Sequence, residues 1–207
     1  DVFVEKPAGT NAKELLGVVE AAKTHTRILM VGYVYVYHPA WKKIKELLQE
    51  RGQSIVKLEM DWQKWGTFNN PLIDDLLCHD IALALSAFGD ITAVKILEKK
   101  GFETDLDEIR AEFSNSTRVV ATAHINRYVK EKKKTVIVVG SKGSKFIWEN
   151  DALYEVVGEK RNEIALADAR SLEQECDAFI EAIATRKPPQ TDGDFALRVR
   201  QLLDSLL

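Results

Sequence analysis

Residues 1–32 combine a short strand, a helix and a buried strand, and this order constrains the fold most. Residues 2–4 are β-branched or aromatic, and residues 11–24 carry apolar side chains at helical spacing. Residues 27–32 (RILMVG) form an almost unbroken apolar run, typical of parallel strands covered on both faces. These patterns predict one βαβ unit. Because one unit cannot cover both faces of its strands, and because the sequence opens at Asp1 within a strand, we expect further residues upstream.

The pattern changes after residue 50. Residues 56–62 alternate apolar and polar, and further strands are predicted at 92–98, 108–114, 117–126, 134–139, 145–148 and 153–157. Short turns between successive strands indicate an antiparallel meander. The lysine-rich run at residues 130–134 is expected to be a solvated hairpin tip, with its turn at residues 131–133.

Helices are predicted at residues 39–50, 72–88, 171–185 and 192–206, the third opening with a capping box of Ser171 and Gln174. The predicted fold class is therefore α/β, more strictly α+β. A partial Rossmann βαβ unit is followed by an open, mostly antiparallel sheet with helices on one face. We expect a Rossmann remnant at 1–32, a substrate-binding and oligomerisation domain at 33–190, and a C-terminal helix at 191–207 that packs back towards the remnant.

Composition and charge exclude several functions. The 207 residues are 45% hydrophobic, and the net charge of −3 gives no general attraction to nucleic acid or to an anionic membrane. No apolar run reaches the roughly 18 residues that a membrane span requires. The two cysteines, Cys78 and Cys176, form neither a disulfide framework nor a metal motif. A reducing, cytoplasmic setting is therefore expected.

Asp75 and His79 are four residues apart in the predicted helix 72–88, a spacing that stacks side chains on one helix face. A general base with its orienting carboxylate and a half-buried ion pair both fit these two residues. With a third ligand from His38 or Asp80 they would instead form a metal site, as in a hydrolase. No second histidine stands at matching spacing, so no metal is predicted.

Residues 5–7 and 33–37 carry two further candidate features. Lys6 comes at the carboxyl end of the first strand, where ligands bind in open α/β sheets. Residues 33–37 (YVYVY) alternate, which places three tyrosines on one side of an extended segment and two valines on the other. The tyrosine rings would either flank a flat ligand or pack against the next helix.

Several motifs occur together in the order and spacing of one known family. Glu5-Lys6-Pro7 resembles the strand end of the Gfo/Idh/MocA oxidoreductases, the family of glucose–fructose oxidoreductase and inositol dehydrogenase. Asp75 and His79 match that family's D-x3-H helix, and residues 32–39 (GYVYVYHP) are similar to its entry into the second domain. The chain departs at Val36, where arginine is common, at Ala82 and at residues 69–71. Residues 65–68 (WGTF) and 77–80 (LCHD) look closer to the nucleotide-sugar 3-dehydrogenase branch.

This resemblance implies an NAD(P)-dependent oxidoreductase that transfers a hydride between the cofactor, NAD or NADP, and a hydroxyl of a sugar, polyol or nucleotide sugar. The implied roles are as follows. The catalytic residues are Lys6, His79 and Asp75; the cofactor contacts are Glu5, Lys6, Pro7 and Tyr33; and the substrate contacts are Tyr35, Trp65, Asp75 and His79.

The sequence contains no GxGxxG turn, so we expect this chain alone to show no affinity for NAD and no activity. The alternatives are a non-catalytic module for substrate binding and oligomerisation and, less favoured, a metal-dependent hydrolase. The expected partners are a small sugar-like molecule and further copies of the chain, in a homodimer or homotetramer formed through a sheet face. Neither nucleic acid nor a membrane is expected as a partner.

Overall fold

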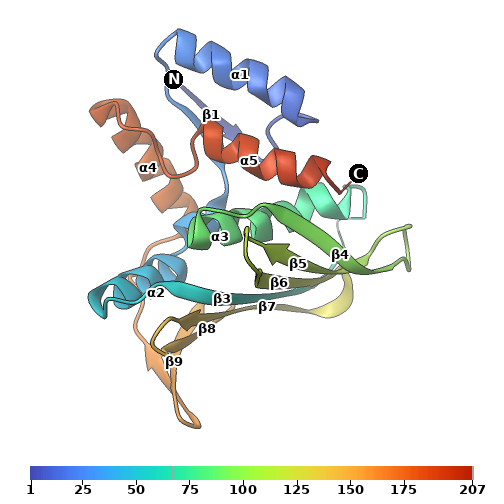
Figure 1. The fold of residues 1–207 in the computed structure, drawn as a ribbon, viewed down its shortest axis with the longest axis vertical. Coiled ribbons are helices and arrows are strands. Elements are labelled where there is room, and N and C mark those ends of the chain that lie inside the picture. The colour runs from blue at the N-terminus through green and yellow to red at the C-terminus, as the bar shows by residue number, and fades with distance from the viewer. Residues whose placement is uncertain (67, 207) are drawn as a thin grey trace.

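The computed structural model describes residues 1–66 and 68–206, so Thr67 of the WGTF motif lies outside the described residues. The predicted βαβ unit is present (Figure 1). Strands β1 (Val2–Glu5) and β2 (Leu29–Gly32) pair in parallel, joined by α1 (Ala12–Thr24). The C-terminal helix α5 (Gly193–Asp204) lies beside α1, and the hydroxyl of Thr191 donates to the carbonyl of Val31 at 2.7 Å. The C-terminus therefore returns to the first strands.

An eight-stranded sheet forms the rest of the molecule, in the order β10-β9-β8-β7-β3-β6-β5-β4. Only β3 and β6 pair in parallel, which confirms the predicted open, mostly antiparallel sheet. The strands are β3 (Ile55–Trp65), β4 (Ala93–Lys100), β5 (Glu108–Ser114), β6 (Val119–Asn126), β7 (Tyr128–Gly140), β8 (Lys145–Glu149), β9 (Ala152–Val157) and β10 (Lys160–Ile164).

Helices cover one face of this sheet, as predicted (Figure 1). They are α2 (Pro39–Glu50) and α3 (Cys78–Phe88), while α4 (Ser171–Thr185) packs Phe179 against Phe3 of β1. Leu58 and Met60 of β3 are buried on the helix side, whereas Lys57 and Glu59 point to the other face. In the part of the chain that the structure describes, no helix covers that second face.

Two local predictions are wrong. Residues 34–37 form a 3₁₀ helix, Val34–Tyr37, instead of an extended segment, and this period of three buries Tyr33, Val36 and Tyr37 together. Residues 131–133 are not a turn but belong to strand β7, in which Lys133 pairs with Gln63 of β3. The next pair joins Tyr128 to Trp65, so the register shifts here and residues 129–132 have no counterpart on β3.

Two smaller differences concern the last third of the chain. Helix α4 begins at Ser171 as predicted, but Glu173 accepts from the backbone N–H of Arg170 at 3.3 Å, so the Ser171–Gln174 capping box is wrong. Strand β10 was not predicted, because four of its five residues are exposed and give no alternation of apolar and polar side chains.

Candidate functional site

Lys6 and Asp75 meet where the βαβ unit joins the large sheet. Lys6 directly follows β1, and its Nζ donates to the backbone carbonyl of Asp75 at 2.5 Å and to Oδ1 of the same residue at 3.2 Å. Both side chains are mostly buried, with 15% and 17% of their area exposed. Lys64 approaches the other carboxylate oxygen of Asp75 at 4.0 Å. One carboxylate therefore lies between two ammonium groups.

The helix that carries Asp75 and His79 is irregular at its start. Residues Ile73–Leu77 form one π-helical turn before α3 begins, and the N–H of Cys78 bonds the carbonyl of Ile73, five residues back. A π turn places residues four apart differently from an α turn. Asp75 pairs with Lys6, and no hydrogen bond joins Asp75 to His79 in the described structure. The stacked pair expected from the spacing is therefore replaced by a contact across 69 residues.

His79 is buried among aromatic rings, with 7% of its area exposed. The ring of Tyr35 meets its imidazole edge-on at 4.8 Å between centroids, and Trp62 lies parallel to it at 6.3 Å. Its Nδ1 has no hydrogen-bond partner among the described residues. Burial holds the pKa of His79 well below its ordinary value, and the ammonium groups of Lys6, Lys134 and Lys64 lower it further. The imidazole is therefore uncharged at neutral pH.

The other residues implied by the resemblance lie around this junction at different depths. Glu5 ends β1, and Pro7 follows Lys6 in an exposed position. Tyr33 is only 2% exposed, because its ring packs edge-on against Phe195 of α5. Tyr35, in contrast, is half-buried beside His79. The structure therefore brings Lys6, Asp75, His79 and Tyr35 into one region and leaves Tyr33 in the core.

Trp65 belongs to an exposed aromatic cluster that the sequence did not indicate as a unit. Its ring is 50% exposed and contacts Tyr128 at 4.8 Å and Phe68 at 5.5 Å. Phe102, 51% exposed, stacks on Tyr128 at 4.9 Å with an interplanar angle of 13°. Trp65 and Phe68 belong to one stretch of the chain, and only the fold shows that Phe102 and Tyr128 are their neighbours. We call these residues, Trp65, Phe68, Phe102 and Tyr128, the aromatic shelf.

A buried ion pair holds the loops beneath the aromatic shelf. Nε of Arg127 donates to Asp107 at 2.8 Å, and the guanidinium also donates to the carbonyl of Asn70 and lies 5.3 Å from the ring of Phe68. Burial alone would raise the pKa of Asp107, but hydrogen bonds from Thr104 and neighbouring groups hold it well below its ordinary value. The carboxylate is therefore ionised and fixes the approach to the Asp75 turn.

The candidate metal ligands do not assemble. Nδ1 of His38 accepts from the backbone N–H of Ala40 at 3.1 Å and so caps α2. Within residues 1–66 and 68–206, no group of three His, Cys, Asp or Glu side chains could hold a metal ion. Cys78 is fully buried and burial raises the pKa of its thiol to about 12, so it is not a nucleophile at neutral pH.

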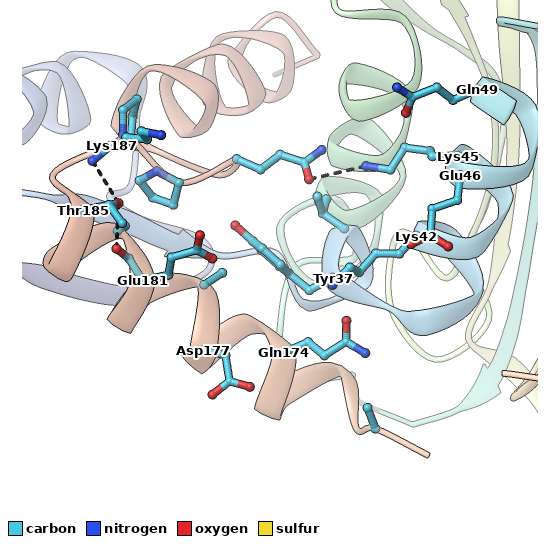
Figure 2. Close-up of a pocket in the computed structure, with 17 residues that line it drawn as sticks. Tyr37, Lys42, Lys45, Glu46, Gln49, Gln174, Asp177, Glu181, Thr185 and Lys187 are labelled. Carbon is cyan, nitrogen blue, oxygen red and sulfur yellow. Dashed lines mark hydrogen bonds between the residues drawn. The ribbon is translucent and has the colours of Figure 1, made fainter. Parts of the chain in front are cut away.

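A large cavity lies elsewhere, in the cleft between α2 and α4 (Figure 2). It measures about 710 Å³ and is lined by side chains of both charges, among them Lys42 and Glu46 from α2 and Asp177 and Glu181 from α4. None of Lys6, Asp75 and His79 lines it. Because mixed surface charge selects no ligand, we place the candidate site at the Lys6–Asp75 junction and not in this cleft.

Comparison with known proteins supports the fold. No protein-family model and no curated protein matches the chain. Among solved structures, a UDP-N-acetylglucosamine 3-dehydrogenase of Acidithiobacillus ferrooxidans superposes with a TM-score of 0.87 at 21% identity, over 98% of this chain and 68% of that one. An aldose–aldose oxidoreductase of Caulobacter crescentus gives 0.82 at 16% identity, over 99% and 68%. A 3-ketoreductase of Actinomadura kijaniata, solved with NADP, gives 0.77 at 15% identity, over 97% and 67%.

The chain therefore has the fold of the larger part of these sugar-modifying oxidoreductases. The resemblance to the Gfo/Idh/MocA oxidoreductases drawn from the sequence is confirmed at the level of the fold. No helix in the described structure is long and apolar enough to cross a membrane.

Proposed function

We propose that this chain belongs to an NAD(P)-dependent oxidoreductase of the Gfo/Idh/MocA type and supplies its proton-transfer and substrate groups. The reaction would transfer a hydride between nicotinamide and a hydroxyl-bearing carbon of a sugar, polyol or nucleotide sugar. The observation that carries the proposal is the Lys6–Asp75 contact at a strand end, with the buried, neutral imidazole of His79 in the same region. Transfer of an activated carboxyl or phosphoryl group does not require a base that takes a proton from an alcohol as a hydride leaves the same carbon.

Each of the three residues has a role that follows from its protonation state. In alcohol oxidation the hydroxyl must lose a proton as a hydride leaves the same carbon. Neutral His79 accepts that proton, and returns it when the carbonyl is reduced. Lys6 donates to the substrate oxygen, while Asp75 holds the lysine in position.

A site for NAD or NADP must bind both the nicotinamide and the diphosphate of the cofactor. The residues of this chain fit the nicotinamide part of such a site only. A bound nicotinamide supplies the hydride acceptor or donor. The carboxyl ends of parallel β1 and β2 meet at Lys6 and Tyr33, where ligands of α/β sheets bind. Glu5, Lys6 and Pro7 would face the nicotinamide ribose, and Tyr33 would support this edge from within the core. The glycine-rich turn that binds a diphosphate is not found in this sequence.

The substrate side is the aromatic surface around His79. Tyr35 contacts the imidazole, and the aromatic shelf lies next in sequence to Lys64, which approaches Asp75. Flat exposed rings stack on the apolar face of a sugar or on a nucleobase. We therefore infer a sugar-like substrate contacted by Tyr35, Trp65, Asp75 and His79. A nucleotide sugar agrees best with the extent of the shelf.

The uncovered face of the large sheet is the proposed oligomer interface, in a homodimer or homotetramer of a cytoplasmic protein. Ile137, Ile147 and Tyr154 form an apolar row across β7, β8 and β9 on this face. Ile147, in the middle of the row, is mostly covered by its neighbours within one chain, with 5% of its area exposed. An apolar row with no helix over it is stabilised by a second sheet. A monomer in light scattering at working concentration would exclude this interface.

Turnover by the protein as its gene encodes it tests the function. NAD and NADP would be offered with sugars, polyols and sugar nucleotides, and the change in absorbance at the nicotinamide band followed. His79→Asn is expected to lower kcat by about a hundredfold or more, since it removes the general base. His25→Asn is the matched control, because His25 is exposed at the end of α1. Equal turnover in both variants would exclude His79 as the base.

The absent glycine-rich turn favours a second candidate, a module that binds substrate and forms oligomers without catalysis. Titration of this 207-residue chain with NAD distinguishes the two. The proposal predicts that the chain binds a sugar nucleotide but not NAD, and that the gene product binds both. Saturable NAD binding by this chain at micromolar concentration would contradict the prediction that these 207 residues lack the site for the cofactor diphosphate.

A further inference from the structure

Lys134 is a buried lysine to which the proposed mechanism gives no role. It lies on β7, with 6% of its area exposed, and its Nζ has no hydrogen-bond partner among the described residues. Three aromatic rings surround the ammonium instead. Its Nζ lies 2.9 Å from the ring centroid of Tyr35, 4.0 Å from that of Trp148 and 4.7 Å from that of Trp62.

The register of the sheet builds this aromatic cage. Trp62 of β3 stands directly opposite Lys134, and Trp148 of β8 stands opposite Val136, two residues further along β7. Both indole rings therefore lie on the helix side of the sheet, beside the lysine. Tyr35 closes the cage from the 3₁₀ helix above. The negative faces of three rings stabilise a cation that has no carboxylate in contact.

Two of the three rings in the cage also hold the proposed general base. Tyr35 meets the imidazole of His79 edge-on at 4.8 Å, and Trp62 lies parallel to it at 6.3 Å with an interplanar angle of 7°. Lys134 and His79 therefore contact the same two rings. A change that frees Tyr35 or Trp62 from the lysine would also free His79.

We propose that Lys134 is a positioning residue for His79: its Nζ packs against the rings of Tyr35 and Trp62 and fixes both rings against the imidazole. This inference rests on the proposed function in one respect only, the role of His79. The cage itself and its influence on the imidazole are properties of the folded chain.

Three charged groups act on Lys134, each from a different part of the fold. Burial lowers the pKa of Lys134 well below its ordinary value; Asp80 of α3 and Asp151 after β8 oppose this, and Lys132 of β7 adds to it. Burial raises the pKa of Asp80 to about 7, against the attraction of Lys134. The same lysine helps burial to lower the pKa of His38 to about 4. The three rings and the carboxylate of Asp80 favour the charged form of Lys134, against the burial that lowers its pKa.

His79 faces a second set of charges. Three lysines lower the pKa of its imidazole after burial has done so, namely Lys6 from the end of β1, Lys134 from β7 and Lys64 from β3. Lys6 and Lys64 each approach Asp75, which offsets part of their charge, whereas Lys134 has no carboxylate within salt-bridge distance in the described structure. Removal of Lys134 should therefore raise the pKa of His79, because no carboxylate among the described residues lies within salt-bridge distance to offset the effect of this lysine.

The imidazole of His79 can be titrated by NMR in the purified protein without substrate or cofactor. Lys134→Met keeps the length of the side chain and removes its charge. We expect the His79 midpoint to move to higher pH and its ring signals to shift. Lys134→Arg should restore the midpoint of the unmodified protein. Lys132→Met is the matched control, since that lysine is exposed two residues away on the same strand and should leave His79 unchanged.

The proposal is overturned if Lys134→Met and Lys132→Met give the same His79 midpoint. Should Lys134→Met fail to fold, the unmodified protein decides the question. Methylene protons of a lysine above three rings are shifted upfield by their ring currents, and a Lys134 signal at its solvated position would exclude the cage. Both readouts are independent of turnover, so an inactive protein would count against the proposed function without affecting this test.

Discussion

Glu175 of α4 is expected to make the stability of this protein depend on pH. Its side chain is 1% exposed, and neither carboxylate oxygen has a hydrogen-bond partner among the described residues. Burial raises the pKa of Glu175 from its ordinary value of 4.5 to about 8, and the nearby negative charge of Glu5 adds to this. A buried acid of this kind is stable in the protonated form and costs free energy when it ionises.

The sign and size of the effect follow from the two pKa values. Because the pKa is higher in the folded protein, the contribution to stability is complete below pH 4.5 and is lost as the pH rises to about 8. At 1.36 kcal/mol per pKa unit, the loss at pH 7 is about 3 kcal/mol. Relaxation around an ionised group reduces this, so we expect Glu175→Gln to stabilise the protein by about 2 kcal/mol at pH 7 and by almost nothing at pH 4.

Urea unfolding followed by circular dichroism at pH 4, 5.5, 7 and 8 measures this difference. Glu181→Gln is the matched control, since Glu181 lies on the same helix but is exposed. The control should change stability by less than about 0.5 kcal/mol at every pH. A gain for Glu175→Gln that is equal at pH 4 and pH 7 would refute an electrostatic origin, and no gain at pH 7 would refute the raised pKa.

Three further substitutions test how the chain is packed. Arg127→Met removes the guanidinium that pairs with the fully buried carboxylate of Asp107 and should destabilise the protein by about 3–5 kcal/mol in thermal or urea unfolding; a loss below about 1 kcal/mol would show that the pair is not desolvated. Gly193→Ala places a Cβ 2.9 Å from a methyl group of Leu29 and should cost about 1–3 kcal/mol. Gly17→Ala, where a Cβ meets nothing within 4 Å in exposed α1, should instead stabilise by about 0.5–1 kcal/mol.

The sequence predicts most of the fold because hydrophobic periodicity reports burial directly. The apolar run at residues 27–32 becomes β2, and the alternation at residues 56–62 becomes β3 with Leu58 and Met60 inside. The predictions that are wrong concern segments whose structure depends on residues far away in the sequence. The charged residues 131–133 belong to strand β7, where Lys133 pairs with Gln63 of β3, and residues 33–37 alternate like a strand but form a 3₁₀ turn.

The candidate site was predictable only in part, for the same reason. Lys6 at a strand end and His79 in a helix were identified from local patterns and from the resemblance to a family. The cage around Lys134 was hidden, since a lysine between Lys133 and Thr135 reads as a solvated residue. Its burial results from strand register, which places Trp62 and Trp148 beside it, and register is a property of the assembled sheet.

Asp75 pairs with Lys6 and not, as its spacing predicted, with His79, and this difference affects how the proposed site would work. A regular helix would have stacked Asp75 on His79 and confined the charge to one element. The π turn gives Asp75 to Lys6 instead, so a hydrogen bond joins the βαβ unit to the helix that carries the base. His79 is held separately, by rings attached to the large sheet. Any movement of the βαβ unit against the sheet would therefore reposition Lys6 and Asp75 relative to His79, and the distance between proton acceptor and oxygen-binding group would change with it.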